Sequence, residues 1–194
     1  THCFSWEEGA IAKDSVDFFY PISLVEKELI LEECRRIGVD GVVTCASDFA
    51  TEVSCWVAEH LSLNTNPYQT VVNIHDKAWV RERTKNITSI SHPKTFSDSL
   101  DNLSLSFFPC IVKPIHGNGK RGVWYVDGPE TLEQIKSCVE YNKDEAAIVE
   151  QFIIGKEYSV ESLTHHGKHY VVQITEKVSD GAPHFVELAH HQPA

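Results

Sequence analysis

A basic, glycine-rich segment lies between two apolar runs in the second half of the chain. It reads VKPIHGNGKRGVWYVD, residues 112–127, and has glycines at positions 117, 119 and 122. Glycine lets backbone N–H groups approach phosphate oxygens, and lysine or arginine adds positive charge. Lys113 ends the preceding run, from where its ammonium group reaches the same anion. The alternative is a long hairpin turn, in which glycines supply positive φ angles and basic residues keep the tip solvated.

Two glutamates follow at a spacing that favours the phosphate interpretation. Glu150 and Glu157 bracket a short apolar run and Gly155 in VEQFIIGKE, residues 149–157. A purine needs an apolar slot with backbone donors and acceptors, and a carboxylate suits the hydroxyl groups of a ribose. The segment has neither the P-loop pattern nor the dinucleotide-binding fingerprint, because no helix follows it directly.

The elements that position these residues alternate between strands and a helix. We expect strands over residues 106–114, 122–127 and 146–153, a helix over 127–142 with Leu132 and Ile135 on its apolar face, and a hairpin across HHGK, residues 165–168. Upstream, helical patterns over residues 22–38 and 48–63 flank a short apolar strand at 41–45, which is typical of a parallel α/β sheet. A polar linker at 64–69 precedes a further helix over residues 70–86.

The composition excludes several classes of function. The net charge of −11 argues against a general nucleic-acid or anionic-membrane surface. No apolar run approaches the roughly 20 residues that span a bilayer, and the N-terminal residues lack a signal-peptide pattern. Six cysteines without a CxxC pattern indicate reduced thiols, so we expect a cytoplasmic protein.

The segments FPCIVKP, HGNGKRGV and AIVEQFIIGKEYSVE together resemble the ATP-grasp superfamily, which includes biotin carboxylase, the large subunit of carbamoyl-phosphate synthase and D-alanine–D-alanine ligase. Upstream, HDKAWVRERTKN is similar to that family's helix with an Asp-Lys pair. DGVVTCASDFATEVSCWVAEHLSL is similar to the second half of the domain that precedes ATP-grasp domains. The likeness is nearest to carboxylate–amine ligases related to carbamoyl-phosphate synthase.

The resemblance implies a role for each matching residue. Lys77 and Lys113 would contact ATP phosphates, and the lid loop over them would contain Gly117, Gly119, Arg121 and Gly122. Glu150 would lie near the adenine amino group, the Gln151 carbonyl and the Ile153 N–H would bind the adenine edge, and Glu157 would bind the ribose. A carboxylate substrate would be bound with the help of Glu187, His190 or His191.

The implied fold is α/β. Residues 1–66 would form part of a Rossmann-like pre-ATP-grasp domain. Residues 67–194 would form an ATP-grasp domain without its C-terminal part, with a lid at about 106–154. His116, Asn118 and Lys120 stand where the lid loop of biotin carboxylase carries glycine. The Mg²⁺ ligands of the family, and the catalytic groups with them, are expected beyond Ala194, so the resemblance implies a truncated enzyme.

The function implied by the resemblance is an ATP-dependent ligase. It binds ATP with Mg²⁺, activates a small carboxylate as an acyl phosphate and lets an amine displace the phosphate, although we expect the 194 residues alone to be inactive. The alternative is a non-catalytic, ATP-binding regulatory module with a degenerate ATP-grasp fold. We expect a homodimer or a partner that supplies the missing part, and neither nucleic acid nor membrane as a partner.

Overall fold

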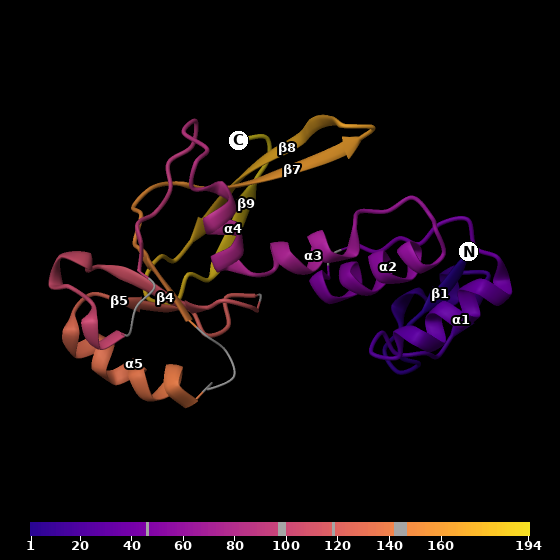
Figure 1. Ribbon diagram of the computed structural model, residues 1–194, viewed down its shortest axis with the longest axis horizontal. Coiled ribbons are helices and arrows are strands. Elements are labelled where there is room, and N and C mark those ends of the chain that lie inside the picture. The colour runs from indigo at the N-terminus through magenta and orange to yellow at the C-terminus, as the bar shows by residue number, and fades with distance from the viewer. Residues whose placement is uncertain (46, 97–99, 118, 142–146) are drawn as a thin grey trace. The chain divides into compact units, whose positions relative to one another are not determined.

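The computed structural model describes residues 1–45, 47–96, 100–117, 119–141 and 147–194, and for 137–141 only the backbone. Asn118 therefore lies outside the described residues. The chain divides into two compact units, Thr1–Glu82 and Arg83–Ala194 (Figure 1). The domain boundary after residue 66 stays a prediction.

The first unit is a small sheet with helices. Strands β1 (His2–Phe4) and β2 (Phe18–Tyr20) pair in parallel, with a 3-10 helix, η1 (Ile11–Ser15), between them. The helices are α1 (Lys27–Ile37), α2 (Asp48–His60), α3 (Tyr68–Ile74) and α4 (Lys77–Thr84). Ile30, Leu31 and Cys34 of α1 pack against Val53 and Val57 of α2 to form the core. Within the described part of the chain, no helix has both the length and the apolar character needed to cross a membrane.

Two of the elements predicted for this unit differ from those that the structure contains. The strand predicted at 41–45 is wrong, because none of these residues lies in a ladder and Val43 is 92 % exposed. An apolar run cannot form a strand without a partner strand. The predicted helix over 70–86 is interrupted, because the Asp76 side chain accepts a hydrogen bond from the Trp79 N–H at 2.8 Å and so caps a new helix, α4.

The second unit begins with a four-stranded antiparallel sheet in the order β3–β6–β4–β5. The strands are β3 (Thr95–Phe96), β4 (Cys110–Pro114), β5 (Trp124–Val126) and β6 (Ala147–Gln151), and the 3-10 helices η2 (Leu100–Asn102) and η3 (Leu105–Phe107) precede β4. Helix α5 (Pro129–Tyr141) covers one face (Figure 1). The predicted strands and helix of this region are confirmed within a few residues.

Strand alternation separates the two faces of this sheet. Cys110 and Val112 of β4 and Val149 of β6 point to α5, where they are buried with Leu132 and Ile135. The residues between them point to the other face, because successive side chains of a strand alternate. Lys113 and Glu150 both belong to this second set.

A three-stranded antiparallel sheet completes the unit. It contains β7 (Glu157–His165), β8 (Lys168–Ser179) and β9 (Glu187–His191). The predicted hairpin is confirmed, since β7 and β8 are joined at His166 and Gly167, both with positive φ. One face carries Glu157, Lys177 and His190 as cross-strand neighbours, and the other carries Tyr158, Glu176 and His191.

The cysteines that the structure describes behave as core thiols with two exceptions. Cys34, Cys55 and Cys110 are buried, Cys3 is half-buried, and Cys45 is exposed. Burial raises the pKa of Cys110 to about 11, so its thiol stays protonated and unreactive at neutral pH.

Candidate functional site

An ion pair occupies the face of the four-stranded sheet that α5 leaves uncovered. The Nζ atom of Lys113 lies 2.5 Å from Oε2 of Glu150, and the two side chains are 19 % and 6 % exposed. The pairing register explains the contact. Lys113 lies opposite Ile148, so Glu150, two residues further along β6, is the diagonal neighbour on the same face. A buried carboxylate needs such a partner, because an unpaired charge is costly to remove from water.

The glycine loop, residues 115–123, connects β4 to β5 beside this pair. Gly117, Gly119 and Gly122 have φ angles of 108°, 64° and 70°, and Lys120 joins them at 59°. A Cβ atom on Gly122 would lie 3.3 Å from ring atoms of Pro114, so both the angle and the space favour glycine there. The described residues from His116 to Gly122 are exposed, which gives an anion in solution access to the backbone of the loop.

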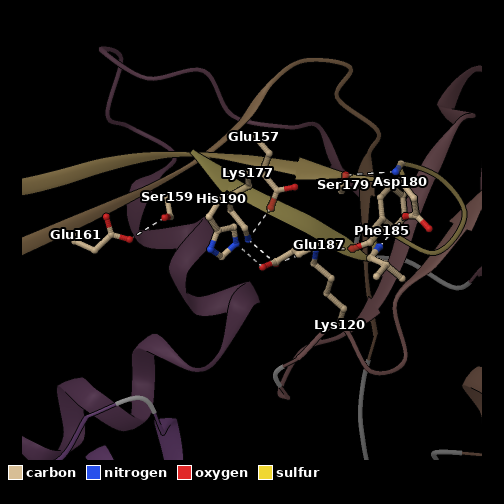
Figure 2. A network of polar contacts seen from close by, with 12 residues as sticks. Lys120, Glu157, Ser159, Glu161, Lys177, Ser179, Asp180, Phe185, Glu187 and His190 are labelled. Atoms are coloured by element: carbon tan, nitrogen blue, oxygen red, sulfur yellow. Dashed lines mark hydrogen bonds and ion pairs between the residues drawn. The ribbon is translucent and has the colours of Figure 1, made fainter. Parts of the chain in front are cut away.

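A lysine–glutamate network joins the glycine loop to the three-stranded sheet (Figure 2). Lys120 Nζ lies 3.1 Å from Oε1 of Glu187 and donates a hydrogen bond of 2.6 Å to the Phe185 carbonyl. Lys177 contacts Glu187 at 2.6 Å and Glu157 at 3.0 Å. His190 Nε2 lies 3.0 Å from Oε2 of Glu187. Glu187 is thus the centre of the network, because it contacts Lys120, Lys177 and His190.

The charged groups of the network stabilise the ionised forms of one another. The Lys177 ammonium, then Lys120 and then His190, lower the pKa of Glu187 to about 2 by hydrogen bonding to its carboxylate. In return, Glu187 and then Glu157 raise the pKa of Lys177. Glu187 is therefore a carboxylate, and Lys177 an ammonium group, across the physiological pH range.

The turn between β8 and β9 fixes the carbonyl group that Lys120 contacts. Phe185 has a φ of 55°, and its N–H donates to the Gly181 carbonyl at 2.7 Å. The Phe185 ring lies 6.4 Å from that of Tyr125 on β5 and 6.0 Å from that of Phe152, measured between centroids. These aromatic contacts hold the turn against β5, which follows the glycine loop in the chain.

The structure brings some of the predicted residues together and separates others. Lys113 meets Glu150 directly, and Glu157 and Glu187 meet through Lys177. His190 contacts Glu187, but His191 points to the opposite face as the cross-strand neighbour of Glu176. His191 therefore does not share a site with the other two predicted substrate residues.

The remaining predicted residues belong to both units of the chain. The Gln151 N–H donates to the Lys94 carbonyl at 2.8 Å, and Ile153 is 61 % exposed. Arg121 lies exposed in the glycine loop, and Lys77 begins α4 in the first unit. Their nucleotide-binding roles stay predictions. Among the described residues, no group of three or more histidine, cysteine or acidic side chains is arranged to hold a metal ion.

Sequence reasoning missed Lys177, which joins two of the predicted residues. Its only signal lies in the hairpin register, which places it directly opposite Glu157. That register depends on an irregularity between Glu161 and Ser162.

Comparison with known proteins identifies the second unit. Residues 106–194 match the family model described as the ATP-grasp domain. This part of the chain is therefore similar to an ATP-grasp domain. The match includes the Lys113–Glu150 pair, the glycine loop and the whole lysine–glutamate network. No curated protein sequence matches the chain.

Several solved structures have a fold similar to that of this chain. An L-amino acid ligase from Bacillus licheniformis has a TM-score of 0.78 at 25 % identity over 96 % of this chain and 46 % of its own. An N5-carboxyaminoimidazole synthetase from Staphylococcus aureus, complexed with ADP, has a TM-score of 0.76 at 14 % identity over 100 % of this chain and 51 % of its own. The biotin carboxylase domain of a Hydrogenobacter thermophilus 2-oxoglutarate carboxylase, in complex with MgADP, ADP and bicarbonate, has a TM-score of 0.74 at 15 % identity over 93 % of this chain and 45 % of its own.

These likenesses confirm the predicted α/β fold with a partial ATP-grasp domain. The chain spans about half the length of the solved structures that it matches. The specific likeness to carbamoyl-phosphate synthase stays a prediction.

Proposed function

We propose that the chain is the nucleotide-binding part of an ATP-dependent ligase, which activates a carboxylate as an acyl phosphate for attack by an amine. The observation that carries the proposal is the ATP-grasp match over residues 106–194, which includes a lysine at the mouth of a glycine loop. The 25 % identity to an L-amino acid ligase over 96 % of the chain supports an amino acid as one substrate.

In this proposal the four-stranded sheet binds the nucleotide. Lys113 contacts the phosphates together with the backbone of the glycine loop. Gln151 and Ile153 bind the adenine edge, with Glu150 near its amino group, and Glu157 binds the ribose. The Lys113–Glu150 pair holds the ammonium group at the strand end, so that little side-chain freedom is lost when phosphate binds.

The chemistry proceeds in two displacements. A carboxylate oxygen of the substrate attacks the γ-phosphorus, the bond to the β-phosphate oxygen breaks, and ADP leaves. The amine nitrogen then attacks the acyl carbon and phosphate leaves, while the nitrogen loses a proton. Mg²⁺ would supply charge neutralisation at the β- and γ-phosphates. Glu187 and His190, which contact each other, would help to bind the carboxylate substrate, and the glycine loop would exclude water from the acyl phosphate.

Calorimetry with ATP and adenosine tests the nucleotide site. We expect the 194-residue chain to bind both, and Lys113→Met to weaken ATP about tenfold to a hundredfold while affecting adenosine much less, because a charged hydrogen bond contributes roughly 1.5–3 kcal/mol. Lys136→Met is the matched control, since Lys136 of α5 pairs with Asp101 and with Glu133 of the same helix. Equal losses for both ligands, or no nucleotide binding by the wild type, would contradict the proposal.

A phosphate-release assay on the full-length natural protein, with Mg²⁺ and a panel of amino acids, tests the ligase reaction. Release that depends on an amino acid supports a ligase. ATP binding without any release would favour the regulatory module instead.

A further inference from the structure

Lys120 makes contacts that a glycine at its position would lack. It stands where the resemblance to biotin carboxylase leads one to expect glycine, and it adopts a left-handed φ of 59°. Its ammonium group reaches out of the glycine loop to the Phe185 carbonyl and to Glu187. The Lys120 side chain is 35 % exposed, as is that of Glu187, so water and anions have access to the pair.

We propose that the contact between Lys120 and Glu187 is a latch, which ties the glycine loop to the three-stranded sheet in the nucleotide-free protein and which a bound triphosphate opens by taking Lys120 from Glu187. The latch joins two segments separated by 65 positions in the sequence. The latch couples the nucleotide site to Glu187. After ATP has bound, Glu187 loses its contact with Lys120 and contacts a group of the substrate instead.

The network allows this exchange without loss of the fold. When Lys120 leaves, Glu187 retains Lys177 at 2.6 Å and His190 at 3.0 Å. A triphosphate carries several negative charges, whereas Glu187 carries one, so the anion competes effectively for an exposed ammonium group. The opening of the latch rests on the proposed function, because it needs a triphosphate in the glycine loop, whereas the contact between Lys120 and Glu187 is observed in the structure.

Amide hydrogen exchange on the nucleotide-free, 194-residue chain tests the latch. The reporters are the Val123 N–H, which donates to the Lys120 carbonyl at 3.3 Å, and the Phe185 N–H. We expect Lys120→Gln and Glu187→Gln each to speed exchange about twofold to fivefold, the range that a partly exposed ion pair supports. The effects of the two substitutions should be less than additive in the double variant, because each one removes the shared contact between Lys120 and Glu187.

Lys156→Gln is the matched control, because Lys156 pairs with Glu176 on the opposite face of the same sheet. It should leave exchange at Val123 and Phe185 unchanged. Unchanged exchange in the Lys120 and Glu187 variants, or fully additive effects in the double variant, would overturn the latch.

Competition for Lys120 is tested with inorganic triphosphate. We expect Glu187→Gln to tighten triphosphate binding about twofold to fivefold, and the same substitution to have no effect in a Lys120→Gln background. A purely structural role of Glu187 would weaken binding in both backgrounds and would overturn the competition. If the wild type binds no triphosphate, the proposed function and the competition both fail, whereas the exchange measurement still decides whether the latch exists.

Discussion

Replacing Lys113 with methionine should destabilise the four-stranded sheet as well as weaken ATP binding. The substitution leaves the Glu150 carboxylate, whose side chain is only 6 % exposed, without the ammonium group that lies 2.5 Å away. Removing one partner of a buried ion pair costs about 3–5 kcal/mol. We expect about 3 kcal/mol, at the lower end, because the 19 % exposure of Lys113 indicates that water lies close to the pair.

A second variant separates the effect of the lost charge from the effect of the changed packing. Lys113→Met/Glu150→Gln replaces both charges with neutral groups of similar volume, a change that is often close to neutral in proteins. We therefore expect it to regain most of the lost stability and to lie within about 1 kcal/mol of the wild type. Glu150→Gln alone should cost less than Lys113→Met, because a lysine can extend its ammonium group towards water.

The measurement is amide hydrogen exchange in β4 and β6, which gives a local free energy of unfolding. A local probe is needed because a chain with two compact units need not unfold in a single transition. The reasoning would be refuted if the double variant were as unstable as Lys113→Met, because the loss would then come from packing and not from the removal of the ammonium group beside Glu150.

Three further outcomes follow from the same structure. The pKa of Glu187, about 2 against an ordinary 4.5, means that its stabilisation is complete above pH 4.5 and is lost as the pH falls towards 2. The difference in local unfolding free energy between wild type and Glu187→Gln, measured by hydrogen exchange in β8 and β9, should therefore shrink as the pH falls over that range. Val112→Ala should destabilise the sheet by roughly 2–3 kcal/mol in hydrogen exchange, from about 0.8 kcal/mol for each lost methyl group plus a cavity, and a loss below 1 kcal/mol would contradict its burial. Glu157→Ala should weaken ATP but not inorganic triphosphate in competition binding, and an equal loss for both would place Glu157 at the phosphates.

The second unit could be predicted well because its strands and helix have clear patterns. The alternation of buried residues at Cys110 and Val112 matches period two, and Leu132 and Ile135 match a helical stripe. The hairpin between β7 and β8 has a glycine at its turn. Each of these patterns involves residues that are close together in the sequence, and each one predicts an element that the structure contains.

The two wrong predictions in the first unit have different causes. Residues 41–45 have the composition of a buried strand, but a strand needs a ladder that no local pattern can reveal. The break between α3 and α4 had a signal that was overlooked, since an aspartate followed by a helical pattern is a typical N-cap.

The lysine–glutamate network could not be predicted because one bulged residue sets its register. Counted back from the turn, the pair His165 and Lys168 would place Glu157 opposite Glu176 in a regular ladder, and like charges directly opposite are destabilising. Between Glu161 and Ser162 the register shifts by one residue, so that Glu157 faces Lys177. Hydrophobic periodicity carries no information about this shift.

The ion pairs of the site determine how a nucleotide must bind. Lys113, Lys120 and Lys177 each contact a carboxylate in the structure. A triphosphate that approaches them therefore meets charges that are already compensated, and it gains attraction only by displacing a carboxylate or by sharing the lysine with it. Glu150 is buried and fixed in its strand, whereas Glu187 is partly exposed and has two further neighbours. Sharing is thus the expected outcome at Lys113 and displacement at Lys120, which places the conformational response to nucleotide in the glycine loop and leaves the sheet unchanged.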